Sequence, residues 1–382
     1  MTLRLTPREM LARLVAFPTV STTSNLDLID FAADYLAGHG VPTRRVPDET
    51  GTKAGLLALV GPAAAGGVVL SGHTDVVPVA GQAWTSDPFA LAEREGRLYG
   101  RGTCDMKGFC AIALALVPEM LAADLSRPVI LALTRDEEIG CIGAPPLIEA
   151  MLATLPRPEA VIVGEPSDMQ VVTGHKASWG FRARVSGHEV HSSLMHTGVS
   201  AIIEAAGFIA WTQNEVAAEA ARTSANDFDP PYTTVHVGLI EGGTANNITA
   251  RSCIFSGEVR CLPDQNPADW RGRLLAEGAR RTALMRAVHA DAGFAFEDRM
   301  LLPGFLADPP AEALARALTG DNGRSVVSYQ TEAGHFQARG LPTVICGPGS
   351  IAQAHQPDEF ITSDQLDAGT AFVRRLIHRL AA

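Results

Sequence analysis

The sequence predicts an α/β protein with a mostly parallel, helix-covered sheet and a smaller α+β domain inserted in the middle of the chain. Two observations support this fold class. Short apolar runs without polar alternation, such as residues 68–71 and 129–134, are separated by helical stretches, as in a sheet covered by helices on both faces. After about Ser178 the pattern changes, and residues 181–185 and 233–237 alternate like half-buried strands.

The elements of the larger domain follow in order from the N-terminus. The first helix has Thr6 as its cap, Pro7 in its first turn and Glu9 where a capping box places a carboxylate. A second helix is expected near residues 27–37. The stretch 109–123 is apolar almost all round, which indicates a buried helix. Four apolar runs that end in polar clusters predict buried strands at residues 68–71, 129–134, 161–163 and 343–346.

The inserted domain is expected to have an antiparallel sheet. Residues 253–259 add a third alternating segment, and helical stretches near 199–211 and 267–288 lie between the strands. From about Gly293 the helix, strand, helix pattern returns. We therefore assign residues 1–178 and 293–382 to the larger domain and residues 179–292 to the insert, a division that suits a chain of 382 residues.

Composition excludes several classes of partner. The net charge is −11 and no run of Lys or Arg exceeds a pair, which argues against nucleic acid or an anionic membrane. Arg4, Arg8 and Arg13 interrupt the stretch that a signal peptide would need to be apolar, and no apolar run approaches the roughly 20 residues of a membrane span. The six cysteines are scattered without a CxxC pair, which favours a reducing compartment. We expect a cytoplasmic protein.

The residues that carry chemistry lie just past the predicted strands or in nearby loops, where open α/β sheets form their binding crevice. A lone loop histidine is more often a packing residue, and paired glutamates more often begin a solvated helix. The concurrence of five acid- or His-bearing turns favours a metal site instead. Two imidazoles and several carboxylates suit zinc, with cobalt or manganese as substitutes. The candidate residues are His73, Asp75, Asp105, Glu137, Glu138, Glu165 and His355.

Spacing also suggests how these residues divide their roles. His73 and Asp75 are two apart, so on an extended segment both can face the crevice, one as a ligand and the other orienting it. Glu137 and Glu138 are adjacent. Just beyond a strand end, one of them can bind metal while the other reaches the attacking water. A carboxylate without its own metal bond is the natural general base for that water.

The motifs SGHTDVVPV, GRGTCDMKG, DEEIG, GEPS and HQPDE, in this order, resemble the M20 family of dinuclear zinc peptidases and deacylases. The resemblance covers nearly the whole chain. It implies two zinc ions bridged by Asp105. His73 and Glu165 would complete one metal position, and Glu138 and His355 would complete the other.

The same resemblance implies further roles in catalysis. Glu137 would be the general base, and Asp75 would orient His73. The family also has a cis peptide bond after the bridging aspartate, which here would join Asp105 and Met106.

In this family the inserted domain is a lid that also forms a homodimer. The segment GHEVHSSLMHTGVSAI resembles the part of the lid whose histidine reaches an active site, and His191 occupies the matching position. It would donate a hydrogen bond to the oxyanion that develops on the carbonyl. The segments GGTANNITA and FSGEVRCLP resemble those that hold substrate, which points to Asn247 and Arg260. Arg260 suits a substrate α-carboxylate because a guanidinium can donate two parallel hydrogen bonds.

Within the family, TEAGHFQ and GPGSIAQAHQPDEF look most like the acetylornithine deacetylases, although Gly334 and His335 depart from their pattern. Glu332 would meet the substrate ammonium group. The expected reaction is hydrolysis of N2-acetyl-L-ornithine to L-ornithine and acetate, a step of arginine biosynthesis.

Three alternatives stay open. The first remains within the hydrolases and is a succinyl-diaminopimelate desuccinylase or a broader N-acyl amino acid deacylase. The second is a non-catalytic amino-acid-binding protein on the same scaffold, which the intact Glu137 disfavours. The third is a nucleotide-binding oxidoreductase, which is remote because no glycine-rich turn follows the first strand.

Overall fold

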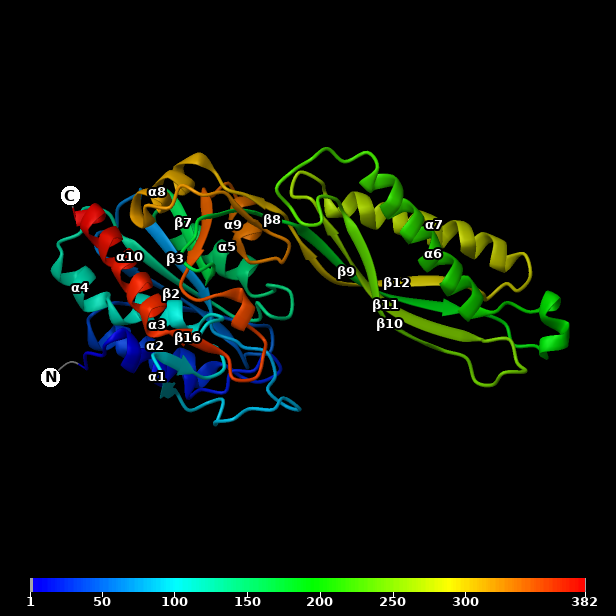
Figure 1. The fold of residues 1–382 in the computed structure, drawn as a ribbon, viewed down its shortest axis with the longest axis horizontal. Coiled ribbons are helices and arrows are strands. Elements are labelled where there is room, and N and C mark those ends of the chain that lie inside the picture. The colour runs from blue at the N-terminus through cyan, green and yellow to red at the C-terminus, as the bar shows by residue number, and fades with distance from the viewer. Residues whose placement is uncertain (1–2, 382) are drawn as a thin grey trace. The chain divides into compact units, whose positions relative to one another are not determined.

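The computed structural model describes residues 3–381, and the chain forms two compact units (Figure 1). Unit 1 contains the segment ending at Thr173, Leu306–Ser325 and the chain from Thr331 onward. Unit 2 contains Gly174–Phe305 and Val326–Gln330. The sequence prediction placed the second boundary earlier, at residue 293. The insert is longer because residues 293–302 form a strand that pairs with a strand of unit 2.

The larger sheet has nine strands in the order β1-β2-β6-β3-β7-β15-β8-β13, with β14 paired to β8. The four central strands β6, β3, β7 and β15 are parallel to one another. The flanking strands β1, β2 and β8 pair antiparallel, so the sheet is mixed, with the parallel centre that the mostly parallel prediction expected. The bounds are β1 Thr43–Pro47, β2 Ala54–Val60, β3 Val68–His73, β6 Val129–Thr134, β7 Ala160–Pro166, β8 Val172–His175, β13 Phe305–Leu306, β14 Ser325–Val327 and β15 Thr343–Gly347.

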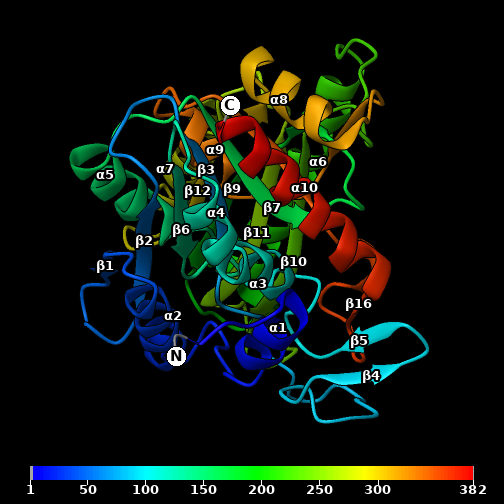
Figure 2. The same cartoon turned by 90° about the vertical axis from the view of Figure 1, so that its left-hand side faces the viewer.

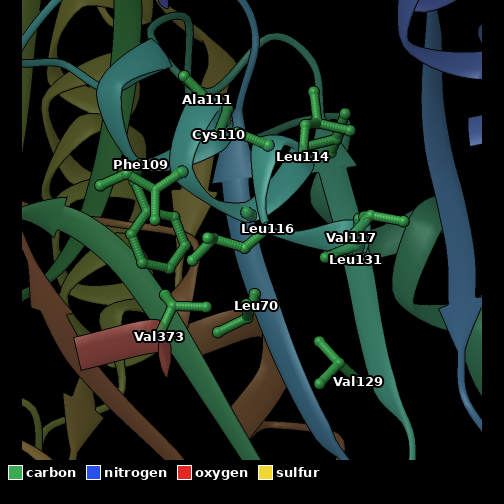
Figure 3. Packing of buried hydrophobic residues seen from close by; sticks show 14 of the residues in the cluster. Leu70, Phe109, Cys110, Ala111, Leu114, Leu116, Val117, Val129, Leu131 and Val373 are labelled. Atoms are coloured by element: carbon green, nitrogen blue, oxygen red, sulfur yellow. The ribbon is translucent and has the colours of Figure 1, made fainter. Parts of the chain in front are cut away.

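Helices cover this sheet, and Figure 2 shows α1, α3 and α10 together on one face. On that face Leu70 of β3 and Leu131 of β6 pack with Phe109 of α3 (Figure 3). Side chains alternate along a strand, so Ser71 and His73 point to the opposite face. The bounds are α1 Pro7–Val15, α2 Leu26–Gly38, α3 Lys107–Ala115, α4 Val117–Ala122, α5 Ala144–Thr154, α8 Pro309–Thr319, α9 Ala333–Gln337 and α10 Ser363–Ala381.

Two predicted helices can be compared directly with the structure. Thr6 and Glu9 form the expected capping box of α1. The expected buried helix at 109–123 begins earlier, at Lys107, and is divided at Leu116 because Pro118 begins the first turn of α4. Every residue of α3 is buried. Within residues 3–381, no helix has both the length and the apolar character that crossing a membrane requires.

A three-stranded sheet, in the order β16-β5-β4, also belongs to unit 1. Its strands are β4 Ala92–Arg94, β5 Arg97–Tyr99 and β16 Phe360–Thr362, and η2, Ile351–Gln353, lies just before β16 in the chain. Because β5 and β16 are antiparallel partners, this sheet joins segments that are far apart in the sequence. The segments that carry Asp105 and His355 adjoin it on either side.

Unit 2 has a four-stranded antiparallel sheet in the order β10-β11-β9-β12, which confirms the expected α+β insert. The core of this unit is aromatic: Phe181 stacks on Trp179, and Phe208 packs against Phe255. The bounds are β9 Ala177–Ser186, β10 Thr234–Gly242, β11 Ser252–Cys261, β12 Gly293–Leu302, η1 Ser192–Thr197, α6 Ala201–Ala220 and α7 Pro267–Arg286.

Candidate metal centre

Five side chains of the types that ligate metal ions converge in unit 1. His73 Nε2 lies 2.9 Å from Asp105 Oδ1 and 4.0 Å from Glu165 Oε1. His355 Nε2 lies 3.2 Å from Asp105 Oδ2 and 2.9 Å from Glu138 Oε2. Each oxygen of Asp105 therefore faces one imidazole, which is the arrangement that a bridging carboxylate needs.

The convergence follows from the sheet, because parallel strands end at the same edge. His73 is the last residue of β3, and Glu165 lies near the end of β7. Glu138 lies four residues beyond Thr134, the last residue of β6, and Thr134 pairs in register with His73. Asp105 stands just before α3, and its bond to Met106 is cis, as the resemblance implied.

A sharp turn after β6 separates the two adjacent glutamates. Asp136 has a left-handed backbone, with φ 56°, and forms ion pairs with Arg135 and Lys53. The Glu137 Oε1 atom accepts a hydrogen bond from Cys141 Sγ at 3.1 Å. Glu137 also lies within ligand range of His73 and Glu165, so geometry alone allows it to be either a ligand or a base.

Asp75 differs in detail from its expected role. The Nδ1 atom of His73 bonds to the main-chain oxygen of Asp75 at 2.9 Å, whereas the carboxylate is 3.8 Å away. That carboxylate instead accepts hydrogen bonds from the backbone N–H of Glu137 at 3.1 Å and from Ser21 Oγ at 2.7 Å. The main chain of Asp75 therefore orients His73 with Nε2 free to ligate, and its side chain holds the turn that carries the glutamates.

The pKa values reflect buried charges that lie close together. Burial raises the pKa of Glu137 to about 8, and the carboxylates of Glu138 and Asp105 add to the shift. Burial, reinforced by the neighbouring carboxylates, also raises the pKa of Glu165 well above its usual range. Hydrogen bonds to Asp105 and Glu138 raise the pKa of His355 to about 10. Such shifts are typical of functional sites.

These residues fit divalent cations. The Oε1 atom of Glu165 is buried and has no hydrogen-bond partner among residues 3–381, which is costly unless the oxygen binds something. Two overlapping groups place their donor atoms within 4.8 Å of one another, one with His73, Glu137 and Glu165 and the other with His73, Asp105 and Glu138. Carboxylates outnumber imidazoles here, so cations would supply the missing positive charge.

Three predicted residues lie in unit 2. His191 is exposed at the start of η1, and its Nδ1 accepts a hydrogen bond from the Ser193 backbone N–H at 3.2 Å. That contact assigns the proton to Nε2, which leaves His191 a donor. Asn247 is exposed, and its main-chain oxygen accepts from Ser192 N–H. Arg260 donates to both carboxylate oxygens of Glu258, at 2.8 and 3.2 Å, so its fork already holds a carboxylate.

The interpretation of Glu332 needs correction. Its side chain is fully buried, and Oε1 accepts a hydrogen bond from Ser71 Oγ at 2.6 Å. Ser71 lies on the same face of β3 as His73. Glu332 therefore forms part of the polar packing on this face of the sheet and presents no surface to a substrate ammonium group.

Sequence reasoning missed two residues next to the site. Cys141 donates to Glu137, but among six scattered cysteines nothing distinguished it. Glu359 accepts hydrogen bonds from the backbone N–H groups of Cys104 and Asp105. It stands inside the quoted motif HQPDE, so its position within the motif was the available signal.

Comparisons with known proteins show the family of the chain and proteins with a similar fold. Residues 69–379 match Peptidase family M20/M25/M40. An acetylornithine deacetylase from Shigella sonnei (strain Ss046) is 35% identical over 385 residues, covering 97% of this chain and 96% of that protein. The M20 family metallo-carboxypeptidase Sso-CP2 from Sulfolobus solfataricus has a similar fold, with a TM-score of 0.78 at 17% identity, over 98% of this chain and 99% of the other. YXEP, a dinuclear metal binding peptidase of the M20 family from Bacillus subtilis, has a TM-score of 0.64 at 17% identity, over 98% of this chain and 97% of the other.

Proposed function

Because the chain belongs to peptidase family M20/M25/M40 and is a metallohydrolase of that family, we propose that it removes the acyl group of an N-acyl amino acid at a two-zinc centre. The observation that carries the proposal is Asp105, whose two oxygens face His73 and His355. Glu165 would complete the position next to His73, and Glu138 the position next to His355. Cobalt or manganese would be able to substitute for zinc.

The proposed chemistry divides between the cations and the chain. When bound, the cations supply Lewis-acid activation of the attacking water and of the substrate carbonyl. Glu137 takes a proton from the water and later returns it to the amine that leaves. Its raised pKa suits both transfers, because a group that titrates near neutral pH can accept and release a proton. In this proposal the Nε2–H group of His191 donates a hydrogen bond to the oxyanion.

The favoured substrate is N2-acetyl-L-ornithine, hydrolysed to L-ornithine and acetate. The acetylornithine deacetylase of Shigella sonnei supports this choice by its 35% identity. Arg260 is the proposed partner of the substrate α-carboxylate, which would displace the carboxylate of Glu258, and Asn247 is proposed to hold the substrate beside it. The buried Glu332 is left out of this assignment.

We also propose a homodimer formed through unit 2. The edge strand β10 exposes Leu239 and Ile240, with 73% and 54% of their surfaces accessible, and α6 exposes Ile203. Large apolar side chains on a sheet edge are typical of an interaction surface. Sedimentation equilibrium checks this, since a Leu239→Glu, Ile240→Lys variant should be monomeric.

A three-substrate assay tests the reaction. The protein is stripped of metal, reloaded with zinc and given N-acetylornithine, N-succinyl-diaminopimelate and N-acetylmethionine in parallel. We expect the highest kcat/KM with N-acetylornithine and no turnover before zinc returns. Preference for another compound would reassign the substrate to a desuccinylase or a broader deacylase. Absence of turnover on all three, despite bound zinc, would favour the non-catalytic binding protein.

A further inference from the structure

The carboxylate of Glu359 organises the loop that leads to Asp105. Its side chain is 1% exposed, and each of its oxygens accepts hydrogen bonds from the loop main chain. Oε1 accepts from the N–H groups of Cys104 at 2.9 Å and Asp105 at 3.1 Å, and Oε2 accepts from Gly102 N–H at 3.1 Å. A single carboxylate therefore fixes three peptide units of the segment that ends at the proposed bridging ligand.

The buried guanidinium of Arg101 extends this contact to the other side of the site. Its Nη1 donates to Glu359 Oε2 at 2.7 Å and to the main-chain oxygen of Gln356 at 3.3 Å. Its Nη2 donates to Gln82 Oε1 at 2.5 Å, and Gln82 Nε2 donates to the main-chain oxygen of His355 at 2.8 Å. The Arg101–Glu359 ion pair is thus linked by hydrogen bonds to the backbone of Asp105, through Glu359, and to the backbone of His355, through Gln82.

The three-stranded sheet β16-β5-β4 already holds the segments that carry Asp105 and His355 next to each other. Tyr99 at the end of β5 pairs with Phe360 at the start of β16, and Gly100 N–H donates to the main-chain oxygen of Glu359. Beyond this pair the loop has little room to move. Gly102 has φ 85°, and a Cβ at this position would lie 2.8 Å from Val76 Cγ1.

We propose that Glu359 and Arg101 are positioning residues that set the separation of Asp105 and His355. These two side chains, with Glu138, would surround one of the two proposed metal positions, so the inference rests on the proposed function. A buried ion pair is poor evidence of a contribution to stability, because desolvation offsets the attraction. The proposed role rests instead on the four donors that converge on the Glu359 carboxylate, next to the loop that carries Asp105.

The first test is Glu359→Gln, which keeps the shape of the side chain but removes its charge and one acceptor. Zinc bound at equilibrium is measured by competition with a chelator, followed by elemental analysis. We expect one zinc to remain tightly bound and the second to bind at least tenfold more weakly, the usual scale for a residue that supports a ligand. The matched control is Glu277→Gln, which breaks a buried carboxylate–arginine contact in unit 2 and should leave both zinc ions bound.

A second readout needs neither metal nor activity. In the metal-free protein, hydrogen exchange at the amides of Gly102, Cys104 and Asp105 should be slow in the wild type and at least tenfold faster in Glu359→Gln. If Glu359→Gln does not fold, Gln82→Ala takes its place, because Gln82 is only half-buried and its loss should weaken only the second zinc. Wild-type zinc affinity together with wild-type exchange would overturn the inference. A wild-type protein that binds no zinc would refute the proposed function, and the exchange rates would still decide the role of Glu359.

Discussion

At the scale of single residues, the site is defined by which atom each carboxylate faces. Asp105 faces two imidazoles, whereas Asp75 faces two backbone amides and a hydroxyl. A carboxylate surrounded by N–H and O–H donors already has its hydrogen bonds. A carboxylate that faces imidazole nitrogens can bind a cation together with those imidazoles. This difference separates a supporting residue from a ligand, although the two have the same chemistry.

Glu137 is the residue whose role is tested most directly. If it is the base, Glu137→Ala should keep both zinc ions and lose about two to four orders of magnitude in kcat, the usual contribution of a positioned general base. Elemental analysis and initial rates on the same preparation measure both quantities. Loss of one zinc would instead make Glu137 a ligand, which its distance from His73 and Glu165 allows.

Cys141 should influence Glu137 through the 3.1 Å hydrogen bond to its Oε1. Cys141→Ala removes that donor, and the loss of about 1 kcal/mol of orientation should lower kcat roughly fivefold with little change in KM. Cys141→Ser keeps a donor and should recover part of the rate. Cys346→Ala, which removes another buried thiol of unit 1, is the control. Equal rates for the Ala and Ser variants would show that the thiol only fills space.

The sequence predicted which side chains converge better than it predicted the residues that support them. His73, Asp105, Glu138 and His355 belong to motifs with a recognisable order, and the structure brings them together. The burial of Glu332 depends on a contact with a residue 261 positions away, which no local pattern encodes.

At the scale of elements, the central strands were predictable because each is an uninterrupted apolar run buried on both faces. β12 was assigned to the wrong domain because its pattern does not reveal its partner. Its pairing with β9 joins residues more than a hundred positions apart, and that pairing determines where unit 2 ends. For the same reason, the mostly parallel sheet was predicted without saying which of its strands pair antiparallel.

The contact between β7 and α3 gives a prediction at this scale. A Cβ at Gly164 would lie 2.0 Å from the ring of Phe109, so the helix packs directly on the strand backbone. Gly164→Ala should therefore lower the free energy of unfolding by about 1–3 kcal/mol or more through overpacking, measured by urea denaturation. Gly272→Ala in α7 is the matched control. In the described part of the chain, no atom outside its own helix turn lies within 4 Å of the added Cβ, so the change should stabilise the helix by about 0.5–1 kcal/mol. A neutral Gly164→Ala would mean that α3 can move away from the sheet without cost.

At the scale of the whole molecule, metal, protons and stability are linked. Without metal, Glu137 titrates at about 8 instead of 4.5, and His355 at about 10 instead of 6.5. Both groups hold protons more tightly in the folded chain than in the unfolded chain. The stability that they contribute is present at low pH and is lost as pH rises. Between pH 6.5 and pH 8 both act in the same direction, and the depressed pKa of Asp105 acts only at much lower pH.

The metal-free protein should therefore become less stable from pH 6.5 to pH 8, by about 1 kcal/mol per pH unit from the buried Glu137. His355 adds a smaller amount, because its side chain is 53% exposed and solvent screens its ion pairs. Zinc should reverse the trend, because it binds the deprotonated ligands and its stabilisation grows as protons leave. Urea unfolding at both pH values, with zinc and with a chelator, measures the two slopes. His355→Ala should flatten the slope of the metal-free protein, since it removes one of the groups whose pKa is raised on folding. A metal-free protein that gains stability over this range would contradict the assignment, because its buried carboxylates would then be ionised without a cation beside them.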